Sequence, residues 1–308
     1  MRVTSCLVEG DTVTDPGEQL LAYYRQPAAM TSAGRHAALI NDLPGEVGEL
    51  AAVAQGLLIH EHLVHAYGVT LSDERRASVH VRQVERLLDL IVAEDDAPLT
   101  TVRPPERRLP GNCRHFSVLM VAFLRAQGVP ARARCGFGAY FNGGFFEDHW
   151  VCEYWNAEQQ RWILVDAQID QTQRGMFEVD FDLLDVPRDR FVVAGDAWAR
   201  CRAGESDPDR YGLSFMKEGG YWWIAGNQMR DVAALNNLEL LPWDVWGAMP
   251  EPNEAIDDER VALFDRLAAL TVVPDSSFDE LGALYRQDER ISVRGTVRNE
   301  LLDRDEEV

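Results

Sequence analysis

Cys113 stands at a point of the sequence where a thiol could act as a nucleophile. It follows a proline–glycine break at 110–111 and opens an apolar run that is typical of a buried helix and ends near Gly128. A helix N-terminus carries a partial positive charge and free N–H groups, and both favour a thiolate over a thiol. The stretch 101–134 also holds seven arginines and only one acid. The sequence therefore predicts a cysteine with a lowered pKa.

A cysteine nucleophile needs a base, and His149 and Asp166 are placed to supply one. His149 begins a strand-like segment, 149–155, and Asp166 lies in the next one, 162–168, after a short polar turn. Two strands joined in this way are expected to be antiparallel neighbours, with facing side chains about 5 Å apart. Asp166 would then hold the His149 ring in the tautomer that accepts the Cys113 proton.

These residues lie in sequence blocks that resemble the transglutaminase-like superfamily. The blocks are GNCRHF at 111–116, LRAQGVPAR at 124–132, DHWVCE at 148–153 and WILVD at 162–166. In that family the Cys, His and Asp of these blocks form a catalytic triad, so the resemblance implies Cys113, His149 and Asp166 as catalytic residues. It also implies an α+β fold of papain-like type, with the cysteine helix packed on an antiparallel sheet. His115 departs from the pattern, because many relatives carry an acid at this position.

The chemistry that this triad implies is acyl transfer through a thioester. The Cys113 thiolate would attack an amide carbonyl, and His149 would protonate the leaving group and then activate water or an amine. The backbone N–H of Cys113 is the expected first donor of an oxyanion hole. We expect hydrolysis of a small-molecule or peptide amide, with an amide-forming acyltransferase of the transglutaminase type as the alternative. Neither reaction requires a cofactor or a metal.

Two interpretations from other classes stay open. A relative that kept the fold and lost catalysis would be a binding module, although the presence of all three triad residues argues against it. A zinc site could use Cys113, His115, His149 and Cys152, but His149 and Cys152 should point to opposite faces of one strand. The histidine-rich stretch 60–65 lacks the His-Glu-x-x-His zinc motif, because valine stands where the second histidine is required.

Two further groups are candidates for substrate contact. Arginine suits carboxylates and phosphates, so Arg107 and Arg108 are expected to hold an anionic group of the substrate, with pairing to acids elsewhere in the chain as the equal alternative. Trp222, Trp223 and Asn227 belong to an aromatic stretch that is predicted to be helical. We expect these three residues to flank the cleft, with a place in the core as the alternative for the tryptophans.

The elements that precede the cysteine are predicted to be helices. Apolar residues recur at helical spacing at 16–24, over 43–67 up to Gly68, and at 81–91, in a helix that Ser72 can cap. Residues 1–100 are therefore predicted to form a helical region packed on the core.

The elements that follow the cysteine predict an α+β fold. The buried helix feeds three strand-like segments, 131–141, 149–155 and 162–168, that would form an antiparallel meander. Residues 101–250 are predicted to be the transglutaminase-like core with its flanking cleft segments, including a helix at 221–237. Residues 251–308 are predicted to be an acidic helical region, with a helix at 261–270 and a frayed end at 304–308.

Composition limits the class of protein. The 308 residues are 46% hydrophobic and 26% charged, as in globular proteins. The net charge of −21 repels phosphate backbones, so we expect no nucleic-acid partner. No apolar stretch reaches the ~18 residues of a membrane span, and the N-terminus lacks the apolar core of a signal peptide. Five scattered cysteines, and arginine in place of nearly every lysine, lead us to expect a bacterial, cytoplasmic protein.

Overall fold

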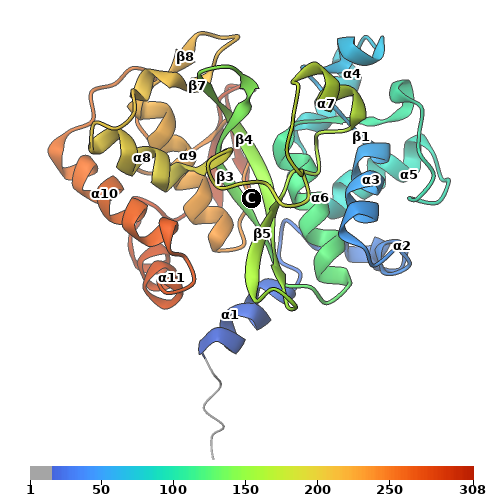
Figure 1. Ribbon diagram of the computed structural model, residues 1–308, viewed down its shortest axis with the longest axis horizontal. Coiled ribbons are helices and arrows are strands. Elements are labelled where there is room, and N and C mark those ends of the chain that lie inside the picture. The colour runs from blue at the N-terminus through green and yellow to red at the C-terminus, as the bar shows by residue number, and fades with distance from the viewer. Residues whose placement is uncertain (1–15) are drawn as a thin grey trace, which may run out of the picture.

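The computed structural model describes residues 16–308 and shows an α+β fold around a central sheet (Figure 1). The predicted meander is confirmed: β3 (Ala131–Asn142) pairs antiparallel with β4 (Phe145–Asn156), which pairs antiparallel with β5 (Arg161–Val165). The sheet is extended by β6 (Phe191–Val193) on β3, and by β7 (Tyr211–Leu213) and β8 (Glu218–Gly219) beyond β4. Short turns between β3, β4 and β5 fix this order, because neighbours in sequence are joined by few residues.

Helix α6 (Cys113–Ala126) is the predicted buried helix, and it packs against β3 and β4. Asn112 caps its start: the Asn112 side chain accepts the N–H of Arg114 at 3.1 Å, and Nδ1 of His115 accepts the N–H of Asn112 at 3.1 Å. The other ring nitrogen of His115 lies 3.0 Å from the carbonyl of Val81, so the ring is neutral with its proton on Nε2. His115 therefore accepts the N–H of the cap residue, the role that a glutamate side chain has in the usual capping box.

Four helices lie on one side of the central strands (Figure 1): α2 (Ala37–Asn41), α3 (Val47–Leu57), α4 (Asp73–Arg76) and α5 (Val84–Glu94). Helix α1 (Pro16–Arg25) lies below the strands in this view, and its Leu20 and Tyr24 pack with the helices that follow the meander. Residues of α2, α3, α5 and α6 share one hydrophobic core with the inner face of the sheet. We call α2–α6 the N-terminal helix group.

Two predictions for this region are wrong in part. The expected helix over 43–67 ends at Leu57, and the next residues form β1 (Leu58–His60), which pairs in parallel with β2 (Leu109–Gly111). Ser72 does cap a helix, but this is the single turn of α4, and α5 begins anew at Val84. Residues 58–60 take their backbone partners from β2, about fifty positions later, and the helical spacing of 43–67 does not record that pairing.

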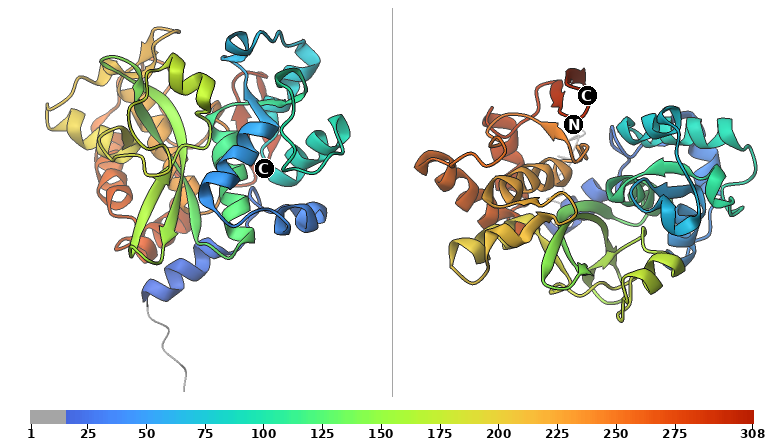
Figure 2. Two further views of the ribbon diagram at one scale, coloured as in Figure 1. Left: turned by 45° about the vertical axis from the view of Figure 1, so that its right-hand side comes forward. Right: turned by 90° about the horizontal axis from the view of Figure 1, so that it is seen from above.

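The helices after the meander lie on the other side of the central strands, as Figures 1 and 2 both show. They are α8 (Ala194–Arg202), the predicted α9 (Tyr221–Leu235), α10 (Asp258–Val272) and α11 (Phe278–Gln287), which we call the C-terminal helix group. A short α7 (Gln171–Met176) follows β5 on the opposite side. Short 3-10 helices connect these elements at Gly34–His36, Val64–Tyr67, Ala77–His80, Pro105–Arg107 and Pro208–Arg210.

Residues 304–308 are not frayed as predicted, whereas the predicted helical character of 251–308 is present in α10 and α11. β11 (Arg304–Glu307) pairs with β10 (Thr296–Asn299), which pairs with β9 (Asp244–Val245). Arg82, before α5, binds both Asp244 at 2.6 Å and Glu306 at 2.8 Å. This ion pair ties the C-terminal hairpin to the N-terminal helix group. In the described part of the chain, no helix is long and apolar enough to cross a membrane.

Candidate active site

His149 and Asp166 meet on one face of the sheet. The register pairs Cys152 with Val165, so Asp166 follows the end of β5 and lies diagonally across from His149 rather than directly opposite. Nε2 of His149 is 2.9 Å from Oδ2 of Asp166, and both side chains are buried. The contact expected from the spacing of the two strands is therefore present.

Two further groups hold Asp166 in its charged form. The hydroxyl of Tyr140 donates to the same Oδ2 at 2.7 Å, and the N–H of Gln168 donates to Oδ1 at 2.9 Å. Burial would raise the pKa of Asp166, but the charge of His149 and these hydrogen bonds lower it below its ordinary value. Asp166 is therefore a fixed, ionised acceptor. Tyr140 was missed from the sequence, because nothing local to β3 marks its hydroxyl as a partner of β5.

Cys113 packs in the same core as Trp150 of β4. The backbone N–H of Trp150, the residue after His149, and that of Arg114 are close enough to the sulfur to lower the pKa of the thiol. Only 7% of Cys113 is exposed. Because Asp166 occupies Nε2 of His149, Nδ1 is the ring nitrogen left to face a thiol. The strands therefore bring His149 and Asp166 together, and the place of Cys113 in a triad with them stays a prediction.

The charge state of Cys113 differs from the sequence prediction. Burial, followed by the nearby carboxylate of Asp148, raises the pKa of the thiol well above its ordinary value. The resting residue is therefore a protonated thiol, and a base must remove its proton during attack. The prediction failed because it treated neighbouring arginines in the sequence as positive charge around the sulfur.

Most of those arginines are buried and bonded elsewhere. Arg103, Arg114, Arg125, Arg132 and Arg134 are each at most 4% exposed. Arg114 donates to the carbonyl of Glu239, and Arg103 donates to the carbonyls of Asp95 and Ala97. Arg125 donates to the carbonyl of Ala131 and to the side-chain oxygens of Thr31 and Asn237. These arginines therefore bind other groups inside the protein and do not surround the Cys113 sulfur with positive charge.

The Arg132 and Arg134 side chains belong to a buried ion network between β3, β4 and α9. Arg134 binds Asp231 at 2.9 Å and Glu153 at 3.3 Å, and Arg132 binds Glu153 at 2.6 Å. Asp231 also accepts the N–H of Cys135 at 2.9 Å, at the edge of β3. This network fixes α9 against the sheet.

Arg107 and Arg108 also have partners. Arg107, in the 3-10 helix Pro105–Arg107, pairs at 3.3 Å with Asp95, the residue after α5. Arg108 is 3.7 Å from Asp170 and donates to the carbonyl of Arg103 at 2.9 Å. These contacts fit the alternative in which the two arginines pair with acids elsewhere in the chain. Substrate binding by either arginine stays a prediction.

The start of α9 lies beside Asp148, and substrate contact by Trp222, Trp223 and Asn227 stays a prediction. Nε1 of Trp223 donates to Oδ2 of Asp148 at 2.6 Å, and Trp222 and Trp223 are both partly exposed. Asn227 is fully buried, so it cannot face solvent directly; its amide donates to the carbonyl of Gly136 at 3.4 Å and also reaches Asp148. Sequence reasoning missed Asp148, although it is adjacent to His149.

His60 and His62 lie near the start of α6, because β1 pairs with β2 just before that helix. Residue 60 pairs with Gly111 in the β1–β2 ladder, two positions before Cys113. Nδ1 of His60 accepts the N–H of His62 at 3.3 Å, and burial, then His62 and His149, lower the pKa of His60 to about 3. The loop between β7 and β8 reaches the same place, where the rings of Phe215 and His62 are 5.2 Å apart.

The residues of the possible zinc site do not converge. Cys152 is packed in the core against α6, whereas His149 points to Asp166 on the other face of β4, as strand geometry requires. Both ring nitrogens of His115 are used by the helix cap and by Val81. Among residues 16–308, no group of three His, Cys, Asp or Glu is arranged to hold a metal ion.

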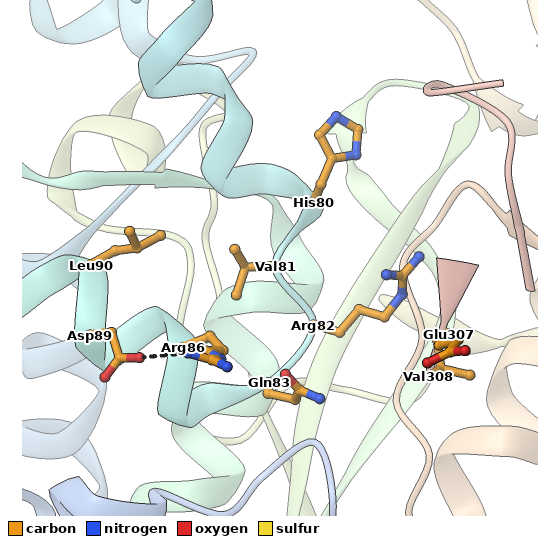
Figure 3. Close-up of a pocket in the computed structure, with 9 residues that line it drawn as sticks. All are labelled: His80, Val81, Arg82, Gln83, Arg86, Asp89, Leu90, Glu307 and Val308. Atoms are coloured by element: carbon orange, nitrogen blue, oxygen red, sulfur yellow. Dashed lines mark ion pairs between the residues drawn. The ribbon is translucent and has the colours of Figure 1, made fainter. Parts of the chain in front are cut away.

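A separate cavity of about 340 Å³ lies between α5 and the end of the chain (Figure 3). Its lining includes Arg82, Arg86 and Asp89. Arg82 pairs with Asp244 and Glu306, and Arg86 is 3.5 Å from Asp89. The cavity shares no lining residue with the Cys113 site, and its Arg82, Arg86 and Asp89 are already paired.

Comparison with known proteins agrees with this geometry. Residues 74–167 match the family model of the transglutaminase-like superfamily, a segment that includes α6 and β3–β5. This segment is a transglutaminase-like core. The match holds Cys113, His149 and Asp166 and covers under a third of the chain.

Solved structures and curated proteins add little to this match. One solved structure, described as "a Putative Cysteine Protease from Cytophaga hutchinsonii", is 17% identical, with a TM-score of 0.31; the match covers 57% of this chain and 48% of that one. The matched part is thus about half the length of that protein. A search of curated proteins gives no match.

Proposed function

We propose that this protein is a cysteine-dependent amidase that hydrolyses a small-molecule or peptide amide through a thioester at Cys113. The observation that carries the proposal is the arrangement around Asp166. A buried carboxylate accepts Nε2–H of His149 at 2.9 Å and the Tyr140 hydroxyl at 2.7 Å, while Cys113 lies against the adjoining residue of β4. This arrangement lies within the transglutaminase-like core, where the family resemblance implies the same three residues.

The first half of the reaction forms the thioester. Nδ1 of His149 takes the Cys113 proton as the sulfur bonds to the amide carbon, and Asp166 stabilises the imidazolium that results. The backbone N–H of Cys113, at the start of α6, supports the negative oxygen of the tetrahedral intermediate. The C–N bond then breaks, and His149 returns the proton to the leaving amine.

The second half releases the acyl group. His149 takes a proton from water as the water oxygen bonds to the thioester carbon, and the C–S bond breaks when that proton returns to sulfur. Because burial raises the pKa of Cys113, this mechanism uses His149 as a general base in both halves. It does not need a thiolate in the resting enzyme.

The proposal places the enzyme in the cytoplasm of a bacterium. Its four described cysteines, Cys113, Cys135, Cys152 and Cys201, are free thiols. That state is the usual one in a reducing compartment.

The test is turnover of fluorogenic peptide amides and 4-nitrophenyl acetate by wild type and three variants. Cys113→Ala and His149→Ala should lose measurable activity, while Cys201→Ala, which removes another buried thiol, should keep it. Mass spectrometry should find the acyl adduct on Cys113. Equal turnover by Cys113→Ala would overturn the proposal.

An amine acceptor separates hydrolysis from acyl transfer. Glycine ethyl ester is added at increasing concentration, and both products are quantified. A hydrolase should yield mainly the free acid, whereas an acyltransferase should yield mainly the new amide, with a rate that rises with the amine. A mainly amide product would replace the hydrolase proposal by the acyltransferase alternative.

A further inference from the structure

The Asp148 carboxylate lies next to Cys113 and has only neutral donors. Nε1 of Trp223 donates to its Oδ2 at 2.6 Å, and the Asn227 amide also binds it. Within residues 16–308 it forms no ion pair, and it is partly exposed. Asp148 lies two residues before Trp150 on β4, so both face the same side of the strand, and Trp150 packs in one core with Cys113. In line with this position, the charge of Asp148 raises the pKa of the Cys113 thiol.

Within residues 16–308, no arginine near the sulfur forms an ion pair with Asp148, although the charge of Arg230 acts against the effect of burial on its pKa. Arg114 is directed to the carbonyl of Glu239. Arg230 is the cation with the largest effect on Asp148, but its Nη1 binds Asn227 at 3.2 Å and its Nη2 binds the carbonyl of Asp244 at 3.1 Å. Asp148 is therefore an acid near Cys113 that forms no ion pair within residues 16–308, in contrast to the anion site expected from the arginine count.

The side chains around Asp148 suit one class of ligand. A carboxylate has about four acceptor positions, and Trp223 and Asn227 use two of them. Trp222 and Trp223 are adjacent, with ring centroids 4.9 Å apart, and both are partly exposed. Indole faces attract ammonium groups, and a carboxylate pairs with them.

We propose that Asp148 binds a primary ammonium group of the substrate, next to the amide carbonyl that Cys113 attacks. This rests on the proposed function, and it names the substrate class: amides with a free amine near the scissile bond, such as the first peptide bond of an unblocked peptide. Trp223 and Asn227 orient the carboxylate toward that ammonium group. An ammonium ligand would also offset the cost of burying Asp148, because burial raises the pKa of Asp148 above its ordinary value.

The charge at this site is measured with alkylthiosulfonates, which need no known substrate. The Cys113 thiolate attacks the sulfenyl sulfur of the reagent, a disulfide forms, and methanesulfinate leaves. We compare 2-aminoethyl methanethiosulfonate, a cation, with 2-sulfonatoethyl methanethiosulfonate, an anion, in a Cys201→Ala background, with the labelled cysteine identified by mass spectrometry. The ratio of the two rate constants is independent of the thiolate fraction, because both reagents react with the same thiolate.

Wild type should prefer the cationic reagent more strongly than free cysteine does. Asp148→Asn should reduce the ratio at least about tenfold, as expected for loss of a unit charge several ångströms away. Asp265→Asn is the matched control, because Asp265 on α10 also accepts a tryptophan Nε1–H, from Trp198 at 2.7 Å. That control should leave the ratio unchanged. An unchanged ratio in Asp148→Asn, or a preference for the anion in wild type, would overturn the proposal.

Salt provides a second measurement if Asp148→Asn fails to fold. The wild-type ratio should fall toward that of free cysteine as ionic strength rises to about 1 M, where charges are screened within about 3 Å. A ratio equal to that of free cysteine at low salt would also contradict the proposal. Neither result depends on amidase activity.

The substrate class is tested with paired fluorogenic amides that differ only in an N-acetyl group. Wild type should turn over alanyl-aminomethylcoumarin with a kcat/KM at least about tenfold above that of its N-acetyl form, and Asp148→Asn should abolish the preference. Preference for the acetylated amide would overturn the ammonium site while leaving the amidase proposal intact. If neither amide is hydrolysed in a Cys113-dependent way, the amidase proposal fails for these amides. The ammonium site then fails as a determinant of substrate choice. The ratio of the two thiosulfonate rate constants still measures the charge beside Cys113.

Discussion

Replacing Asp166 by asparagine changes one atom and should disable His149. Oδ2 of Asp166 accepts from both His149 and Tyr140, while Oδ1 accepts from the N–H of Gln168. If the asparagine NH2 takes the place of Oδ2, it faces two donors, and His149 can accept from it only in the tautomer that carries its proton on Nδ1. That tautomer cannot take the Cys113 proton. If the NH2 takes the other place, it leaves the N–H of Gln168 without an acceptor.

The size of the effect follows from charge and geometry. The imidazolium and the carboxylate, about 4 Å apart between charge centres at an effective dielectric constant of about 20, attract by about 4 kcal/mol. Loss of this attraction in the transition state alone corresponds to about a thousandfold fall in kcat/KM, at about 1.4 kcal/mol per tenfold. Tyr140→Phe keeps the carboxylate and removes one hydrogen bond to a charged group, about 1.5 kcal/mol, so it should cost about tenfold.

The assay is hydrolysis of 4-nitrophenyl acetate and of the best peptide amide, with thermal unfolding measured on each variant. Both variants should remain folded, since each replaces a side chain by one of nearly equal volume. The expected order of kcat/KM is wild type, then Tyr140→Phe, then Asp166→Asn, then Cys113→Ala. If folded Asp166→Asn retains activity within about threefold of wild type, Asp166 does not act on His149 as argued.

Three predictions concern stability. Arg134→Met should lower the free energy of unfolding by about 3–5 kcal/mol in urea titrations, because it leaves the buried Asp231 charge without its partner; a change under 1 kcal/mol would contradict this. Burial raises the pKa of Glu61 to about 7. The folded state therefore loses stability as the pH rises from about 4.3 to about 7. Glu61→Gln should raise the melting temperature at pH 8 and change it little at pH 4.5. Burial acts to raise the pKa of Glu306, but hydrogen bonds from Arg304, Asn299 and Arg82 lower it to about 2. Ionised Glu306 therefore stabilises the folded state above about pH 4.3, and this stabilisation is lost toward pH 2. Glu306→Gln should make the free energy of unfolding depend less steeply on pH in this range. An unchanged dependence would refute the role of Glu306.

Local patterns were sufficient for the elements that carry the proposed triad. The apolar run after Cys113 and the glycine that ends it predicted α6, and alternating segments joined by short turns predicted β3, β4 and β5. Because those turns leave few ways to pair the strands, His149 and Asp166 had to be neighbours. The order of the motif blocks identified the same three residues by resemblance.

Contacts between distant segments had no such local signal. β1 pairs with β2 across fifty residues, and the last strand is held by its partner β10 and by Arg82. The periodicity of 43–67 and the polar end of the chain predicted a helix and a frayed tail, because neither pattern records a partner that lies far away in sequence. Tertiary pairing decided both.

By itself, the sequence determined which residues could react and which neighbouring strands hold them. Only the tertiary structure decided their charge. Cys113 is a protonated thiol beside Asp148, although seven arginines surround it in sequence, because most of those arginines are buried against carbonyls and acids of other elements. Burial and ion pairing depend on which segments meet in space. The electrostatics of the site therefore follows from the packing of α6, β4 and α9, and not from the order of residues along the chain.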